Sequence, residues 1–117
     1  MDLSPKELDA SGRMKLVELT GEMDALLSAS IEKGIEKIIH DGCRGLTLDM
    51  SGVGYIDSSG IRVLLSAYKK LTKLGGKMNL LNPSERVMMI LELADLTDIL
   101  KRFNTIDEAL ADLSITT

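Results

Sequence analysis

The fold is decided by residues 55–65, which read Tyr-Ile-Asp-Ser-Ser-Gly-Ile-Arg-Val-Leu-Leu. An apolar, strand-like run ends at Ile56, and an apolar pattern with helical spacing begins at Ile61. Between them lie residue types that cap helices and form turns, namely Asp57, Ser58, Ser59 and Gly60. The stretch is therefore predicted to be a strand-to-helix junction with hydroxyl groups at the N-terminus of the helix.

The composition indicates one soluble globular domain over residues 1–117. Only 3% of the residues are aromatic, so an aliphatic core is expected. The net charge of −4 and the scarcity of aromatic rings argue against nucleic-acid binding. No apolar run approaches the roughly 20 residues that span a bilayer. Together with the polar N-terminus and the single Cys43, this predicts a cytoplasmic protein without membrane insertion.

Toward the N-terminus, two strands and a helix are expected. A strand over residues 2–9, placed at a sheet edge because of Pro5, and a strand over residues 14–20 are predicted to form an antiparallel hairpin. Residues 25–27 are predicted to be a loop or a first turn, and Ser28 is the predicted N-cap. The helix should end at Gly42, with an inner face formed by Leu27, Ile31, Ile35, Ile38 and Ile39.

The strand before the junction is predicted over residues 46–50, and a loop over residues 51–54. Along this strand, Thr47 and Asp49 alternate with apolar residues. A parallel strand buried on both faces is normally apolar throughout, so the helices are expected to cover one face more fully than the other.

After the junction, a helix is predicted whose inner stripe consists of Ile61, Leu64, Leu65, Tyr68, Leu71 and Leu74, widened by Val63. It ends at Gly75–Gly76, and a parallel strand follows over residues 77–82. A third helix should start at Pro83–Ser84. Residues 99–100 are predicted either to form a short strand or to pack without one.

The last helix is predicted to start at a capping box, Thr105 to Glu108. Its inner face should consist of Ile106, Ala109, Leu110 and Leu113. The order of these elements indicates a small α/β domain with a mixed sheet.

Metal, cofactor and enzyme chemistry find little support in the sequence. His40 and Cys43 stand without neighbouring ligands, and no Gly-x-Ser-x-Gly elbow is present. The glycine pairs lack the Lys-Ser/Thr of a phosphate-binding loop. Asp49 lacks the acidic pair that a receiver-type phosphorylation site needs. We therefore expect no cofactor, no metal and no catalytic residues.

The junction itself allows two interpretations. In the first, Asp57 or Ser58 simply caps the helix, and Gly60 permits close approach of the backbone. In the second, the extra hydroxyl is a phosphorylation site, because the helix dipole and free N–H groups favour a phosphate there. Arg62, one turn beyond Ser58, could pair with that phosphate. Asp24 also follows a strand and is expected nearby, since parallel strands end at one edge.

Residues 48–65, Leu-Asp-Met-Ser-Gly-Val-Gly-Tyr-Ile-Asp-Ser-Ser-Gly-Ile-Arg-Val-Leu-Leu, resemble the signature of STAS domains, in particular the bacterial anti-sigma factor antagonists. The resemblance continues in residues 19–24, in Gly75–Gly76 and in residues 82–84. It implies a STAS-like mixed sheet of four to five strands with about four helices, in which the N-terminal strand is antiparallel at an edge.

The resemblance also implies a function. In that family the first hydroxyl of the motif, here Ser58, is the phospho-acceptor. The unphosphorylated antagonist binds an anti-sigma factor that is also a serine kinase, which releases a sigma factor. Phosphorylation ends the binding, and a serine phosphatase restores it. The implied partner-binding residues are Asp24, Asp57, Ser58, Ser59, Gly60 and Arg62, on a protein that is not an enzyme and is a monomer by default.

Two alternatives within the same family remain. The chain could be an accessory subunit of a membrane lipid-transport ABC complex, or a phosphorylation-switched regulator outside sigma control. Two features depart from a polar switch surface. Residues 25–27 are apolar. Arg62 either helps to hold a phosphate or contacts an acidic kinase surface.

Overall fold

The sheet at the centre of the molecule contains both antiparallel and parallel strands. A computed structural model describes residues 3–114, and within them a five-stranded sheet has the order β1-β2-β3-β4-β5. The strand β1 pairs antiparallel with β2, and every later pair is parallel. This confirms the predicted mixed α/β fold and its antiparallel edge strand. The elements are β1 (Lys6–Glu7), β2 (Met14–Met23), α1 (Ala25–His40), β3 (Gly45–Ile56), α2 (Ser58–Lys73), β4 (Lys77–Leu81), α3 (Glu85–Leu93), β5 (Arg102–Phe103) and α4 (Ile106–Ser114).

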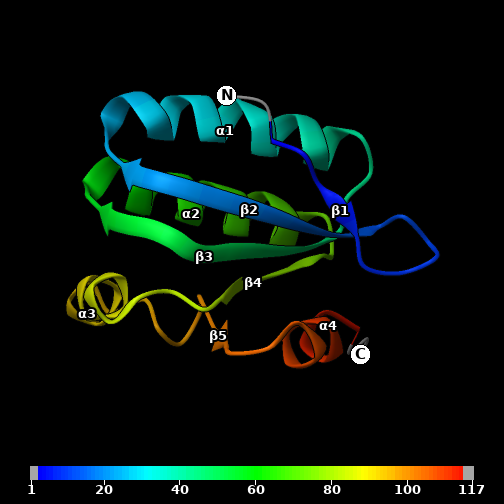
Figure 1. Cartoon of the computed structure of the whole chain (residues 1–117). Coiled ribbons are helices and arrows are strands. Elements are labelled where there is room, and N and C mark those ends of the chain that lie inside the picture. Colours follow the sequence, from blue (N-terminus) through cyan, green and yellow to red (C-terminus); the bar gives the residue numbers. More distant parts are fainter. Residues whose placement is uncertain (1–2, 115–117) are drawn as a thin grey trace.

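The four helices of the described chain form two pairs, and one pair lies on each side of the sheet. In Figure 1, α1 and α2 lie on one side of the strands, and α3 and α4 lie on the other. The first pair packs together and covers β2, β3 and β4, while α4 packs on β3, β4 and β5. The core between them is aliphatic, as the composition predicts. Within residues 3–114, no helix is both long enough and apolar enough to cross a membrane.

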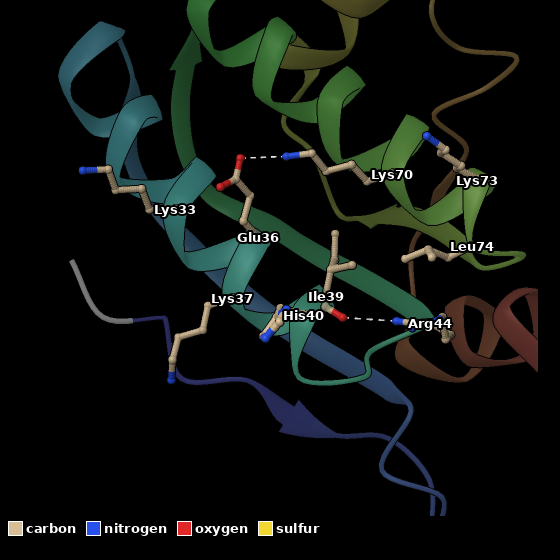
Figure 2. A pocket seen from close by; sticks show the side chains of 9 residues that line it. All are labelled: Lys33, Glu36, Lys37, Ile39, His40, Arg44, Lys70, Lys73 and Leu74. Carbon is tan, nitrogen blue, oxygen red and sulfur yellow. Dashed lines mark hydrogen bonds and ion pairs between the residues drawn. The ribbon is translucent and has the colours of Figure 1, made fainter.

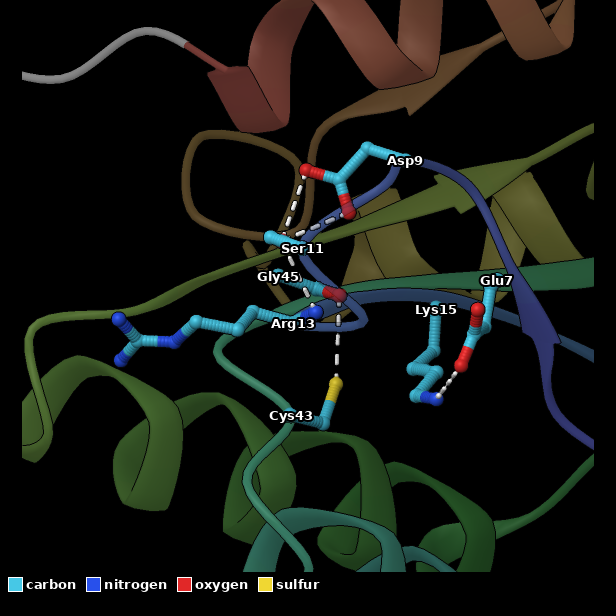
Figure 3. A network of polar contacts seen from close by, with 7 residues as sticks. All are labelled: Glu7, Asp9, Ser11, Arg13, Lys15, Cys43 and Gly45. Carbon is cyan, nitrogen blue, oxygen red and sulfur yellow. Dashed lines mark hydrogen bonds and ion pairs between the residues drawn. The ribbon is translucent and has the colours of Figure 1, made fainter.

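The hairpin formed by β1 and β2 closes the N-terminal edge. The Ser11 hydroxyl donates to both carboxylate oxygens of Asp9, at 2.8 and 2.9 Å, and accepts from the Arg13 N–H at 3.1 Å (Figure 3). Gly12 has φ of +71°, as tight turns favour. The antiparallel pair is shorter than the predicted strand over residues 2–9, since β1 covers only Lys6–Glu7 and residue 2 lies outside the described part of the chain.

A buried polar network holds α4 on the sheet. Thr47 in β3 and Asn79 in β4 are both fully buried. The Thr47 hydroxyl donates to Asn79 Oδ1 at 2.6 Å, and Asn79 Nδ2 donates to the Ala109 carbonyl and to Asp112 Oδ2, both at 3.0 Å. Thr47, on the polar face of β3, is thus buried as completely as Leu46 and Leu48 on the apolar face. The expectation that one face is covered less is wrong at this position, because Asn79 satisfies the buried hydroxyl group.

The two central strands end together although they differ in length. β2 has 10 residues and β3 has 12. Two register shifts, between Glu18 and Thr20 and between Gly21 and Glu22, absorb the difference as bulges of β3. Residues 51–54 therefore belong to β3, and the predicted loop there is wrong. After both bulges, Met23 again pairs with Ile56.

The start of α1 differs from the prediction. Its N-cap is Asp24, whose carboxylate accepts from the Leu27 N–H at 3.0 Å, so Ser28 is not the cap and residues 25–27 are the first helical turn. Ser28 is instead fully buried, and its hydroxyl has no hydrogen-bond partner within the described residues. Asp24 is the cap because it directly follows β2 and its side chain reaches the free N–H of Leu27 in the first turn, while Ala25, Leu26 and Leu27 readily adopt helical conformation.

Smaller differences occur toward the C-terminus. The short strand is β5 at residues 102–103, whereas Leu100 packs in the core and Ile99 is partly exposed. Ser84 caps α3 through the Val87 N–H. Two residues predicted to face inward are largely exposed instead, namely Leu74 at the end of α2 and Ile106 at the start of α4. Both lie at helix ends, where the apolar stripe has already turned away from the sheet.

The N-terminus of α2 approaches the ends of β2 and β3 very closely at Gly60. A Cβ atom there would lie 2.5 Å from Ile56 Cγ1, 2.8 Å from Met23 Cβ and 3.0 Å from the Met23 carbonyl oxygen. One of these atoms belongs to the backbone, which cannot move aside without shifting the strand. This confirms that Gly60 is needed for the close approach of the helix.

We expect Gly60→Ala to lower the free energy of unfolding by about 1–3 kcal/mol, because the added methyl group overpacks this contact. The matched control is Gly54→Ala, since a Cβ at Gly54 would have no atom within 4 Å. That variant should stay within about 0.5 kcal/mol of the wild type. Chemical denaturation of all three proteins measures the difference. Equal stability of the two variants would contradict the close contact.

Cys43 carries a buried thiol two residues before β3 begins. Its Sγ–H donates to the Gly45 carbonyl oxygen at 3.3 Å (Figure 3). Burial raises the pKa of the Cys43 thiol, and the charge of Lys15 opposes that rise only partly. A thiol with a raised pKa is a weak nucleophile, which fits a packing role for the buried Cys43 side chain.

The raised pKa predicts a loss of stability at alkaline pH. In the unfolded chain the thiol deprotonates near pH 8.5, while the folded chain keeps its proton to higher pH. The thiol's contribution is therefore full below the unfolded pKa and is lost as the pH rises through the folded pKa. We expect the stability advantage of the wild type over Cys43→Ala, measured by urea unfolding, to shrink between pH 7 and pH 10. An unchanged difference would contradict the raised pKa.

Candidate functional site

The two N-caps Asp24 and Asp57 lie side by side at one end of the sheet. Met23 pairs with Ile56 as the last residue of each strand, and the Asp57 N–H donates to the Met23 carbonyl oxygen at 3.2 Å. The strands are parallel, so α1 and α2 both begin at this edge (Figure 1). The sequence predicted this proximity from the rule that parallel strands end together.

Asp57 already occupies the free amides at the start of α2. Its Oδ1 accepts from the Ser59 N–H at 2.8 Å and from the Gly60 N–H at 3.3 Å, and its carbonyl accepts from the Ile61 N–H at 3.0 Å. Asp57 is therefore the cap, which decides between the two candidates left open by the sequence. These amides are not available to a phosphate, contrary to the expected free N–H groups.

Ser58 is the first residue of α2, and it is exposed. Because Asp57 caps the helix, the Ser58 hydroxyl is not needed to satisfy the backbone. Ser59 differs from Ser58, since its N–H is bonded to Asp57 and the residue is half-buried. The structure thus distinguishes two adjacent hydroxyls that the sequence presents as equivalent.

Arg62 lies one helical turn beyond Ser58 and is exposed. Within residues 3–114 its side chain forms no ion pair or hydrogen bond. Residues four apart share one face of a helix, so the guanidinium can reach toward Ser58 or toward a bound partner. Both roles left open by the sequence remain compatible with this position.

An apolar side chain stands beside Asp24. Leu26 in the first turn of α1 is 85% exposed, whereas Leu27 turns inward and packs toward Gly21. The apolar segment at residues 25–27 is thus part helix packing and part exposed surface.

A contact between an arginine and a tyrosine borders the same edge, and the sequence alone does not indicate it. The guanidinium carbon of Arg86, in α3, lies 5.9 Å from the centre of the Tyr55 ring, and Tyr55 is 39% exposed. Tyr55 precedes the junction by two residues, but Arg86 is 31 positions further along the chain. No local pattern pairs them, because the contact depends on how α3 packs against the end of β3.

The polar side chains at this edge differ in how far the fold already uses them. Asp24 and Asp57 are both engaged as caps, and Ser58 has no histidine beside it in the sequence. Among the described residues, no three side chains of the types that bind metals come together. The edge presents an exposed hydroxyl, two carboxylates and a cation on one surface.

Comparison with known proteins agrees with this arrangement. The family model of the STAS domain matches residues 6–109. The anti-sigma F factor antagonist of Paenibacillus polymyxa is 26% identical over 93% of this chain and 94% of its own. The anti-sigma-B factor antagonist of Bacillus subtilis is 29% identical over 72% of this chain and 76% of its own.

Solved structures share the fold. The anti-sigma factor antagonist SpoIIAA in its unphosphorylated form superposes with a TM-score of 0.81 at 21% identity, covering 98% of this chain and 99% of its own. The phosphorylated form of the Bacillus protein superposes with a TM-score of 0.71, also at 21% identity, covering 94% and 97%. The match to the family model extends over most of the chain, which therefore belongs to the STAS domain family.

Proposed function

We propose that this protein is an anti-sigma factor antagonist whose binding is switched off by phosphorylation of Ser58. The unphosphorylated protein binds an anti-sigma factor that is also a serine kinase and thereby releases a sigma factor. The kinase phosphorylates Ser58, and a serine phosphatase reverses the modification. The protein acts in the cytoplasm as one monomeric domain and without catalysis of its own. The relatives named as antagonists support this proposal.

The observation that carries the choice of Ser58 is the occupied cap. Asp57 accepts from two of the first amides of α2, so the exposed Ser58 hydroxyl has no structural task. A kinase can modify it without breaking a bond that the fold uses. Ser59 is less suitable because it is half-buried and tied through its own N–H.

The physical effect of the phosphate is charge. Phosphorylation adds about −1.5 to −2 charges to a neutral hydroxyl. Asp57 and Asp24 already place carboxylates on the same edge. A packed interface over this edge would have to desolvate the new charge beside them, at a cost of several kcal/mol. Even about 3 kcal/mol weakens binding more than a hundredfold.

The partner-binding surface in this proposal consists of Asp24, Asp57, Ser58, Ser59, Gly60 and Arg62. Gly60 contributes by position, because it is buried and sets how close α2 lies to the strands. Arg62 contributes the cation, and Asp24 extends the surface to the start of α1. The adjacent exposed Leu26 supplies an apolar contact at its rim.

We expect Ser58→Asp to weaken binding to the cognate anti-sigma factor by about tenfold or more, since it places a fixed negative charge at the switch position. Ser58→Ala should bind within about threefold of the wild type and should accept no phosphate. Ser59→Ala is the matched control for the modification, since it removes the neighbouring hydroxyl and should still be phosphorylated on Ser58. Calorimetric titration measures the affinities, and mass spectrometry after incubation with the kinase and ATP locates the phosphate.

The Asp variant is suited to this test because acidic residues stabilise helix N-termini, so Ser58→Asp should remain folded. Circular dichroism and thermal unfolding check this before binding is measured. Stoichiometric phosphate on Ser58→Ala would overturn the assignment of the site. Equal affinity of Ser58→Asp and wild type would overturn the charge mechanism even if Ser58 is phosphorylated.

A further inference from the structure

The outer face of α3 carries apolar side chains at positions where a surface helix is normally polar. Met89 is 61% exposed and Leu93 is 83% exposed, whereas Val87 and Leu91 on the inner face are completely buried. The inner pair belongs to the hydrophobic core and holds α3 on the sheet. Met89 and Leu93 are therefore not needed to attach the helix, and they remain largely open to solvent.

Arg86 lies on the same face of α3 as these two residues. It precedes Met89 by three positions and Leu93 by seven, a spacing that aligns side chains along one side of a helix. We call Arg86, Met89 and Leu93 the α3 stripe. A rise of about 1.5 Å per residue places Leu93 only about 10 Å along the helix from Arg86. The α3 stripe is thus a short surface that begins with a cation and ends with a leucine.

Arg86 occupies an electrostatically unfavourable position. Ser84 is the N-cap of α3, so Arg86 is in the first turn, where the helix dipole disfavours a cation. Among the residues that the structure describes, its guanidinium forms no ion pair and no hydrogen bond. It lies over the Tyr55 ring, 5.9 Å from the ring centre. This contact orients the guanidinium and leaves its N–H donors unused.

Tyr55 joins the α3 stripe to the edge that carries Ser58. The chain has two tyrosines and one phenylalanine, and Tyr55 is the tyrosine that is exposed, while Tyr68 packs against the core. Successive side chains of a strand point to opposite faces, so Tyr55 faces α3 and Ile56 faces α2. Asp57 follows directly. The exposed surface therefore extends from Asp57 and Ser58 across Tyr55 to the α3 stripe.

The composition of this surface is that of a protein interface. Single exposed leucines are ordinary on soluble proteins, but here two apolar side chains adjoin an exposed tyrosine and an unpaired arginine. Tyrosine, arginine and methionine are enriched in protein interfaces. The α3 stripe lies on the outside of a helix and is convex, whereas small molecules bind in concave pockets. A protein partner therefore fits this surface better than a small ligand.

We propose that Tyr55 and the α3 stripe form a second contact region for the same anti-sigma factor that covers Ser58. The inference rests on the proposed function and extends its interface to α3. Met89 and Leu93 pack against an apolar part of the partner. Arg86 donates to a partner carboxylate while it lies on the Tyr55 ring, since a guanidinium binds carboxylates with two parallel N–H groups.

One partner can cover both regions. A standard interface buries about 800 Å² on each protein, and Tyr55 lies only two residues from Asp57. Asp24 and Glu22 are exposed near this edge, yet in the described chain neither forms an ion pair with Arg86. The matching partner surface is therefore basic opposite the carboxylates and acidic opposite Arg86. Such a pattern fixes the orientation in which the partner binds.

Charge reversal tests the cation. We expect Arg86→Glu to weaken binding of the cognate anti-sigma factor, measured by calorimetric titration, by about tenfold or more, because two carboxylates would then face each other. Arg13→Glu is the matched control, since it makes the same change of charge at an exposed position directly before β2, at the opposite end of that strand. It should bind within about twofold of the wild type, because salt screens charges beyond about 8 Å. Arg86→Glu should remain folded, since the first turn of a helix favours an acidic residue.

Removal of apolar surface tests the other end of the α3 stripe. Leu93→Gln should weaken binding by about three- to tenfold, because the partner loses an apolar contact. Glutamine has a helix propensity close to that of leucine, so α3 should persist. Leu74→Gln is the matched control, since Leu74 is an exposed leucine at the other end of α2 from Asp57 (Figure 2). It should bind as tightly as the wild type. In an NMR titration with the anti-sigma factor, the amide signals of residues 54–60 and 85–93 should change together.

Three results would overturn this inference and leave the switch intact. If Arg86→Glu and Leu93→Gln bind like the wild type while Ser58→Asp binds weakly, the interface ends before α3. If Arg13→Glu loses as much affinity as Arg86→Glu, the effect is general charge attraction. A wild-type dimer in sedimentation analysis that Leu93→Gln converts to monomers would assign the α3 stripe to a second copy of the chain. Absence of any binding by the wild type would overturn the proposed function itself, and this extension with it.

Discussion

The hydrogen bond from the Asp57 N–H to the Met23 carbonyl oxygen, at 3.2 Å, joins the ends of the two central strands. The geometry of the candidate switch depends on this joint. Two bulges in β3 use its extra residues, so that Ile56 still pairs with Met23. Without the bulges, β3 would extend two residues beyond the end of β2, and Asp24 and Asp57 would not lie side by side. Gly60 completes the joint by allowing α2 to approach within the space that a methyl group would occupy.

The same helix pair carries opposite charge at its two ends. At the N-termini, carboxylates accept backbone N–H groups, as at Asp24 and Asp57. At the C-termini, lysines lie in the last helical turns, namely Lys37 in α1 and Lys70 and Lys73 in α2. Helix dipoles favour this polarity in any helix. At the N-terminal end, one oxygen of each carboxylate, Oδ1, serves as the cap. At the C-terminal end, Lys70 also pairs with Glu36 across the two helices at 2.7 Å (Figure 2), and Lys37 pairs with Asp41 at 3.9 Å.

The sequence predicts the parts of the fold that depend on local periodicity and on chain order. The alternation in residues 14–20 and the helical spacing around Ile35 and Leu64 are local signals, and the elements that they predict are present. The parallel order of the strands then places Asp24 beside Asp57. Both statements follow from residues close together in the chain or from a general rule of topology.

The structure differs from the sequence-based prediction where residues far apart in the chain determine the local conformation. The cap of α1 moves to Asp24 because β2 continues to Met23, and it continues because β3 pairs with it through residues 51–56. The polar Thr47 is buried because Asn79 and α4 receive it. The contact of Arg86 with Tyr55 requires the packing of α3. The strand pairing, the Thr47–Asn79 bond and the Arg86–Tyr55 contact each join residues about 30 positions apart in the chain.

The occupied cap also determines what kind of switch this edge can be. A phosphate on Ser58 would find the Ser59 and Gly60 amides already bonded to Asp57. Docking onto the helix would require the phosphate to displace a carboxylate that is bonded to both. Arg62, one turn away, is the nearby cation along the helix, and a contact between exposed groups contributes little. A phosphate on Ser58 would therefore gain too little from contacts within this domain to change its conformation. Its charge remains at the surface, where it acts on whatever protein has to cover it.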